Sequence, residues 1–151
     1  MDFSKFNQAF DLNALKNDIA EAAENGGGNY KEVPVGQYEV KIDKMELTES
    51  KKGDPMVSVW FKVLAGEYEG SRIFMNQVVN QGFQIHIVNT FLRSLDTGLE
   101  IGFEDFEQYG NLLLDVMEKI DAQKLEFALD YGKTSKGFNT YEITEVYEGN
   151  D

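Results

Sequence analysis

Residues 33–80 read VPVGQYEVKIDKMELTESKKGDPMVSVWFKVLAGEYEGSRIFMNQVVN, and this stretch predicts three consecutive antiparallel strands. β-Branched and aromatic residues alternate with polar ones in three runs that have the length of strands. Turn residues, above all glycine, separate the runs and permit tight reversals of the chain. The predicted strands cover Gly36–Glu49, Pro55–Val63 and Arg72–Val79.

The alternation within the first two strands predicts their shape. In the first strand the apolar phase slips by one residue near Asp43-Lys44, which indicates a β-bulge that lets one long strand bend. The second strand has an expected core face, formed by Val57, Val59, Phe61 and Val63. Its other face is half polar and includes the only tryptophan of the chain, and it consists of Met56, Ser58, Trp60 and Lys62.

A helical section and two further strands follow. The predicted segments are a helix over 84–95, a second helical section over 103–120 broken near Gly110-Asn111, and strands over 124–131 and 138–147. This order, with a bulged first strand and a helix between strands three and four, is typical of the OB barrel. We therefore expect a mainly β, α+β fold. Specifically, we expect a five-stranded OB-type barrel over 33–151 with a helical insert at about 84–120.

Residues 1–32 predict a helical arm attached to the barrel domain. Phe3, Phe6 and Phe10 have helical spacing, as do the apolar residues that follow, and the segment 25–29 forms a glycine-rich joint. The arm either packs on its own barrel or docks on a neighbouring subunit, and the sequence leaves both alternatives open. We expect a homo-oligomer.

Length and composition exclude several classes of protein. A chain of 151 residues can form a single domain with an ordinary core. The absence of cysteine excludes disulfides, a thiol nucleophile and cysteine-ligated zinc. No apolar run approaches the ~18 residues of a membrane span, and the polar start MDFSKFNQAF is not typical of a secretory signal. We expect an intracellular protein that does not contact the membrane.

Catalytic motifs are not apparent either. The chain has no histidine–carboxylate metal motif and no glycine-rich phosphate loop. The one histidine, His86, falls inside a predicted helix and is expected to be structural. We therefore interpret the chain as a non-enzyme, with no catalytic residue, no metal site and no cofactor.

The expected fold suggests a binding surface for single-stranded nucleic acid. OB folds bind ligands across strands two and three, beneath the loops that join strands one to two and four to five. Each of these loops carries a pair of lysines here, in a chain whose formal net charge is -13. Single-strand binding requires cations for phosphates and flat side chains for bases. The candidate residues are Lys51, Lys52, Lys133 and Lys136 in the loops, Trp60, Phe74 and Phe138 for stacking, and Lys62, Arg72 and Asn76 for phosphates or bases.

Several of these residues have structural alternatives, and the loop lysines could simply make the turns soluble. Trp60 could instead pack beneath the arm or in a subunit interface, because tryptophan is usually highly buried. For Phe74 a place in the core is favoured, since the third strand has apolar residues in both phases.

Several motifs resemble a family of small proteins encoded in phage replication and recombination gene clusters, some of them treated as single-stranded-DNA-binding proteins. These motifs are Val35–Ile42, Glu46–Met56, Gly70–Gln77, Phe91–Leu95 and Lys136–Asn139. The resemblance implies an OB fold that binds single-stranded DNA without strong sequence preference. It also implies phage or host replication and recombination proteins as partners, and the cytoplasm of the bacterial host cell as the location.

The acidic charge of the chain supports a second interpretation. Between residues 96 and 121 there are eight acidic residues and one base, Lys119, and a solvated helix surface is the favoured interpretation of this cluster. A continuous negative face could bind a basic surface of a host nucleic-acid enzyme, so that the protein acts as an inhibitor or DNA mimic. The two interpretations differ in the sign of the charge at the binding surface.

Overall fold

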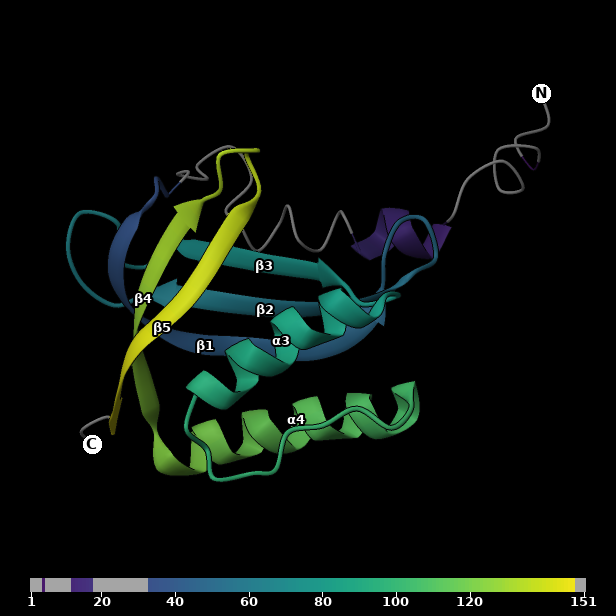
Figure 1. Cartoon of the computed structure of the whole chain (residues 1–151). Coiled ribbons are helices and arrows are strands. Elements are labelled where there is room, and N and C mark those ends of the chain that lie inside the picture. The colour runs from purple at the N-terminus through teal and green to yellow at the C-terminus, as the bar shows by residue number, and fades with distance from the viewer. Residues whose placement is uncertain (1–3, 5–11, 18–32, 149–151) are drawn as a thin grey trace.

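The computed structural model describes residue 4, residues 12–17 and residues 33–148 (Figure 1). Residues 12–17 are helical. The domain that follows consists of β1 (Gly36–Glu49), β2 (Pro55–Val63), β3 (Arg72–Val78), α3 (Gly82–Ser94), α4 (Phe106–Gln123), β4 (Leu125–Lys133) and β5 (Asn139–Glu148). The expectations for Phe3, Phe6, Phe10 and the joint at 25–29 lie outside the described residues.

The five strands form one open antiparallel sheet in the order β3-β2-β1-β4-β5. The first strand is shared, because residues 36–40 pair with β4 and residues 40–49 pair with β2. The register between β1 and β2 shifts between Ile42 and Lys44, so the predicted bulge is confirmed. The mainly β, α+β class is confirmed as well, and the bounds of β1 and β2 are those predicted.

One face of the sheet and both helices form the core. The predicted core face of β2 is fully buried, since Val57, Val59, Phe61 and Val63 are each 0% exposed. The helices contribute a stripe of apolar side chains at helical spacing: Val88, Phe91 and Leu92 from α3, and Tyr109, Leu112, Leu113, Val116 and Ile120 from α4. Because side chains alternate across a strand, the opposite face of β1–β3 carries a different set of residues. We call this opposite face the outer face.

Helix α4 is continuous, and the predicted break near Gly110-Asn111 is wrong. A glycine inside a helix costs about 1 kcal/mol relative to alanine. Each large apolar side chain of the buried stripe contributes about 1.5–3 kcal/mol on burial, so the stripe outweighs the local preference of one glycine. Asp105 begins the helix, because its carboxylate accepts a hydrogen bond from the backbone N–H of Gln108 at 2.7 Å.

Replacing Gly110 by alanine should therefore stabilise the protein by about 0.5–1 kcal/mol. A Cβ atom at this position would lie 3.6 Å from Cδ2 of Leu47 on β1, which is ordinary van der Waals contact. Urea unfolding followed by circular dichroism measures the change. A loss of stability would show that Leu47 does not accommodate the added methyl group.

The ends of the remaining elements lie within three residues of their predicted bounds, and β3 begins at Arg72 as predicted. His86 on α3 is exposed, so the expectation of a structural histidine is wrong. It lies beside Ile87, which is 46% exposed, and Phe83, which is 62% exposed, and these side chains face away from the core. None of the helices in the described part of the chain has both the length and the apolar character needed to cross a membrane.

Candidate nucleic-acid interface

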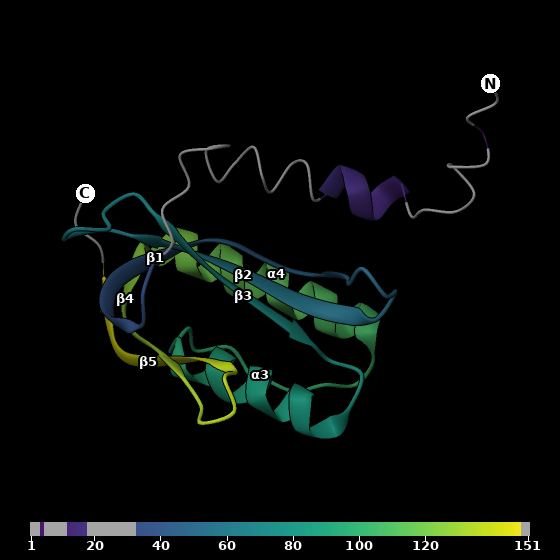
Figure 2. The same ribbon diagram turned by 90° about the horizontal axis from the view of Figure 1, so that it is seen from above.

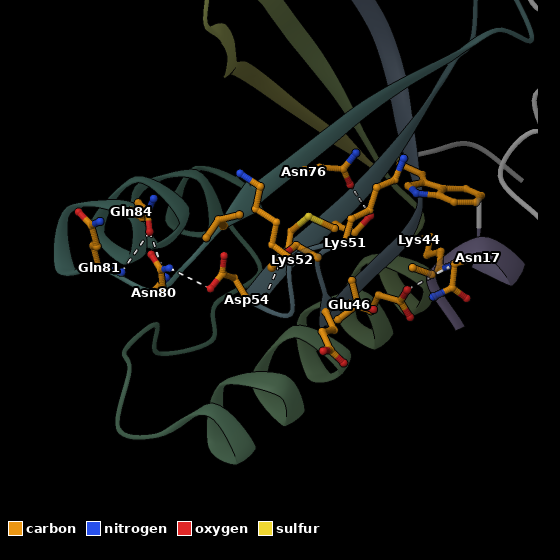
Figure 3. Close-up of a pocket in the computed structure, with 18 residues that line it drawn as sticks. Asn17, Lys44, Glu46, Lys51, Lys52, Asp54, Asn76, Asn80, Gln81 and Gln84 are labelled. Atoms are coloured by element: carbon orange, nitrogen blue, oxygen red, sulfur yellow. Dashed lines mark hydrogen bonds and ion pairs between the residues drawn. The ribbon is translucent and has the colours of Figure 1, made fainter. Parts of the chain in front are cut away.

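An open groove of about 900 Å³ runs over the outer face of β1, β2 and β3 (Figure 3). The loop between β1 and β2 and the start of α3 line its rim, and two residues of the helix at 12–17 complete it. Its lining comprises Ala14, Asn17, Lys44, Glu46, Thr48, Glu49, Ser50, Lys51, Lys52, Asp54, Met56, Ser58, Trp60, Asn76, Val78, Asn80, Gln81 and Gln84.

The pairing of the strands places the central groove residues on one face. Ser58 lies opposite Asn76, and Trp60 lies opposite both Phe74 on β3 and Lys44 on β1. Residues that are directly opposite in antiparallel strands project from the same face of the sheet. The hydroxyl of Ser58 donates a hydrogen bond to Oδ1 of Asn76 at 2.9 Å, which leaves the exposed amide N–H₂ of Asn76 directed to a ligand or solvent.

Trp60 lies on the predicted face but is only 5% exposed. Its ring system packs perpendicular to that of Phe74, with ring centroids 5.3 Å apart and an interplanar angle of 89°. Nζ of Lys44 lies 4.4 Å from the indole centroid, in cation–π geometry. In this conformation the indole is therefore covered and offers no open stacking surface. Packing of Trp60 beneath the arm or in a subunit interface stays a prediction.

Phe74 faces outward, and the favoured place for it in the core is wrong. Ile73 and Met75 take the core positions of β3, where each is 3% exposed. Phe74 is half-buried on the outer face against Trp60 and does not line the groove. It supports the tryptophan from the side.

The charges in the groove are mixed. Three lysines and three acidic residues line it, so its formal charge is zero within a chain of net charge -13. Nζ of Lys44 lies 3.3 Å from Oε1 of Glu46, while Lys51 and Lys52 are exposed on the β1–β2 loop. The amide of Asn80 donates to Oδ1 of Asp54 at 3.2 Å, which fixes this loop to the start of α3. Relative to the rest of the surface, the groove is the less negative region.

Lys62 and Arg72 lie opposite each other outside the groove. Nη2 and Nε of Arg72 lie 3.1 and 3.2 Å from Oδ2 of Asp43, so the charge of this guanidinium is already paired. A phosphate would have to compete with Asp43 for it. We expect this ion pair to connect β3 with the bulged part of β1 across the intervening strand β2.

The second lysine pair lies apart from the groove. Lys133 is exposed at the end of β4, and Lys136 and Phe138 are exposed in the loop between β4 and β5, where Phe138 is 69% exposed. Figures 1 and 2 show this loop well separated from the β1–β2 loop in both views. Among the described residues, none of the groove lining comes from the β4–β5 loop. The structure thus brings together Lys51, Lys52, Trp60 and Asn76, and leaves the second pair elsewhere.

Residues 18–143 match the model of a family described as Protein of unknown function (DUF669). The chain belongs to this family. No curated protein matches it. The matched range contains every groove residue of the sheet, the β1–β2 loop and α3, whereas Ala14 and Asn17 precede it.

Sequence reasoning missed Lys44 as a residue of the site. The signal was present, because the bulge between Ile42 and Lys44 is what places this lysine opposite Trp60. With regular alternation Lys44 would share a face with Ile42, which lies in the core. In the described part of the chain, no group of three or more histidine, aspartate or glutamate side chains could hold a metal ion.

Proposed function

We propose that the groove binds single-stranded DNA without strong sequence preference. The observation that supports this most is the meeting of Lys51 and Lys52 with Trp60 and Asn76 in one groove on the outer face of the sheet. Sequence-tolerant single-strand binding uses cations that follow the phosphates and aromatic rings that stack on bases. The amide of Asn76 adds a hydrogen-bond donor in the middle of the groove.

We also propose that the open sheet is an OB-type barrel, a fold that is commonly only partly closed. In such a barrel the two edge strands, here β3 and β5, approach each other. The hydroxyl of Tyr141 on β5 donates a hydrogen bond to the backbone carbonyl of Phe74 on β3 at 2.6 Å. This hydrogen bond supports the proposal that β3 and β5 lie close together. The contact is made by one side chain and not by a ladder of backbone hydrogen bonds.

Removing this bond should destabilise the protein. Burial raises the pKa of Tyr141 to about 12, so the hydroxyl keeps its proton at neutral pH and remains a donor. In Tyr141→Phe the carbonyl of Phe74 loses its donor, and we expect a loss of about 1–2 kcal/mol in the free energy of unfolding. Tyr147→Phe is the matched control, because its exposed hydroxyl contacts the exposed carboxylate of Glu145. Equal, negligible effects from both would argue against closure through Tyr141.

The biological setting that we propose is phage DNA replication or recombination, in the cytoplasm of the bacterial host. The resemblance of the strand and loop motifs to proteins of phage replication clusters supports it. Partner proteins of the same process and a homo-oligomeric state belong to this proposal. We propose a non-catalytic role for this groove, whose polar lining consists of lysines, carboxylates, amides and hydroxyls.

Photo-cross-linking tests the function and its location together. An oligo-dT strand carrying 4-thiothymidine is mixed with the protein, irradiated and digested, and the modified peptides are identified by mass spectrometry. We expect the modified peptides to come from residues 44–60 and 76–84. Cross-links confined to the β4–β5 loop or to α4, or none at all, would contradict the groove as the DNA site.

One observation favours the alternative of an acidic inhibitor or DNA mimic. Helix α4 exposes Glu107, Asp115, Glu118 and Asp121 around Leu114, which is 58% exposed. Such a face could bind a basic surface of a nucleic-acid enzyme. This function is favoured if the protein binds no oligonucleotide and reversal of two α4 charges abolishes inhibition of a host nuclease.

A further inference from the structure

We propose that Lys44 closes the Trp60 end of the groove and opens it by moving to a phosphate of bound DNA. This inference rests on the proposed DNA-binding function and assigns a positioning role to a residue of the same site. Figure 3 shows Lys44 and Glu46 towards one end of the groove, with Asn80, Gln81 and Gln84 at the other end.

Two side chains, those of Lys44 and Phe74, contact the indole of Trp60. The ammonium of Lys44 lies over the indole ring, 4.4 Å from its centroid, and Phe74 packs against the indole with its ring nearly perpendicular. A base that stacks on Trp60 needs an open ring face. Stacking therefore requires Lys44 to leave the position it has in the structure.

The interactions that hold Lys44 are weak ones. Its side chain is 42% exposed and that of Glu46 is 40% exposed, so solvent screens their ion pair. A cation–π contact at a partly exposed site is also modest. A DNA phosphate can replace the carboxylate of Glu46 as the ionic partner of the ammonium. Phosphate binding and uncovering of the ring then occur together.

The indole also has a polar group that the described part of the free protein leaves unsatisfied. Nε1 of Trp60 is buried and has no hydrogen-bond partner among the residues that the structure describes. A buried donor without an acceptor is unfavourable, and native structures rarely retain one without a reason. An oxygen of a base or a phosphate in the opened groove would supply the acceptor. Trp60 would thus gain a stacked base and a hydrogen bond in the same step.

Acrylamide quenching of Trp60 fluorescence tests the closure without DNA, because Trp60 is the only tryptophan of the chain. In Lys44→Ala we expect the quenching constant to rise at least two-fold. Lys41→Ala is the matched control on the same strand, since Lys41 pairs with Asp43 at 3.7 Å and does not line the groove. It should leave the quenching constant unchanged.

Oligo-dT binding tests the opening. In the wild type we expect DNA to change the emission of Trp60. Lys44→Met keeps an unbranched apolar side chain over the ring but cannot bind a phosphate. In this variant the slope of the logarithm of the binding constant against the logarithm of the salt concentration should be smaller in magnitude by about 0.7. The change in Trp60 emission on DNA binding should also be smaller. This variant also keeps the test available if the alanine variant does not fold.

The outcomes separate the two proposals. An unchanged quenching constant in Lys44→Ala would overturn the closure by Lys44, whether or not the protein binds DNA. An emission change of wild-type size in Lys44→Met would overturn the exchange of Lys44 to a phosphate. If the wild type does not bind oligo-dT, the DNA function fails and the opening step fails with it.

Discussion

Replacing Trp60 by alanine should lower the free energy of unfolding by about 3–5 kcal/mol. The indole is 5% exposed, packs against Phe74 and has the ammonium of Lys44 over its ring, so the truncation removes a large buried aromatic group and leaves a cavity on the outer face. Urea unfolding followed by far-UV circular dichroism measures the effect. Because of this cost, loss of DNA binding in Trp60→Ala would not by itself demonstrate stacking.

Phe138→Ala is the control for the loss of an aromatic ring. Phe138 is 69% exposed, and its truncation should change the stability by less than about 0.5 kcal/mol. A loss of under about 1 kcal/mol in Trp60→Ala would contradict the buried position of the indole. Trp60 would then be available for stacking in the free protein, and Lys44 would not have to move before a base could stack.

Neutralising Lys51 and Lys52 together should weaken binding of single-stranded DNA roughly 25-fold at 0.1 M salt. Each lost phosphate contact removes about 0.7 from the log–log salt slope on single strands, so the double variant should lose about 1.4. The two lysines are exposed at the rim of the groove, so their removal should leave the fold intact. Anisotropy titrations of oligo-dT at several salt concentrations measure both quantities.

The matched control neutralises Lys133 and Lys136. It makes the same change in net charge at another exposed place, the end of β4 and the β4–β5 loop, which contributes no residue to the groove. The sequence predicts that both loops form walls of one groove, whereas the groove in the structure contains only the first pair. We therefore expect a much smaller loss from the control. Equal losses from both double variants would contradict the assignment of binding to this groove.

The strands of the fold could be predicted because their signal is local. Alternation along β1 and β2 gave their bounds, and one slip in the phase located the bulge. The break in α4 was predicted wrongly because a glycine is a local signal, while the buried stripe that overrides it depends on packing against the sheet. The sequence did not determine whether Phe74 lies on the core face or the outer face, because apolar residues occupy both phases of β3.

The candidate site could be predicted in part. Lys51, Lys52 and Asn76 lie in the groove because strand pairing fixes which loop and which side chains border the outer face. The burial of Trp60 depends on Lys44 and Phe74, which come from two other strands, and on the shift in register that brings Lys44 across. The position of the β4–β5 loop depends on how the whole sheet curls. Spacing in the sequence does not contain that information.

The most direct test of single-strand binding compares two ligands of equal length with the wild-type protein. Fluorescence anisotropy of a labelled oligo-dT strand and of a labelled duplex is followed during titration at low salt and again at higher salt. We expect the protein to bind the single strand, to bind the duplex much more weakly, and to lose affinity as the salt concentration rises. Binding to neither ligand at low salt would contradict the proposed function.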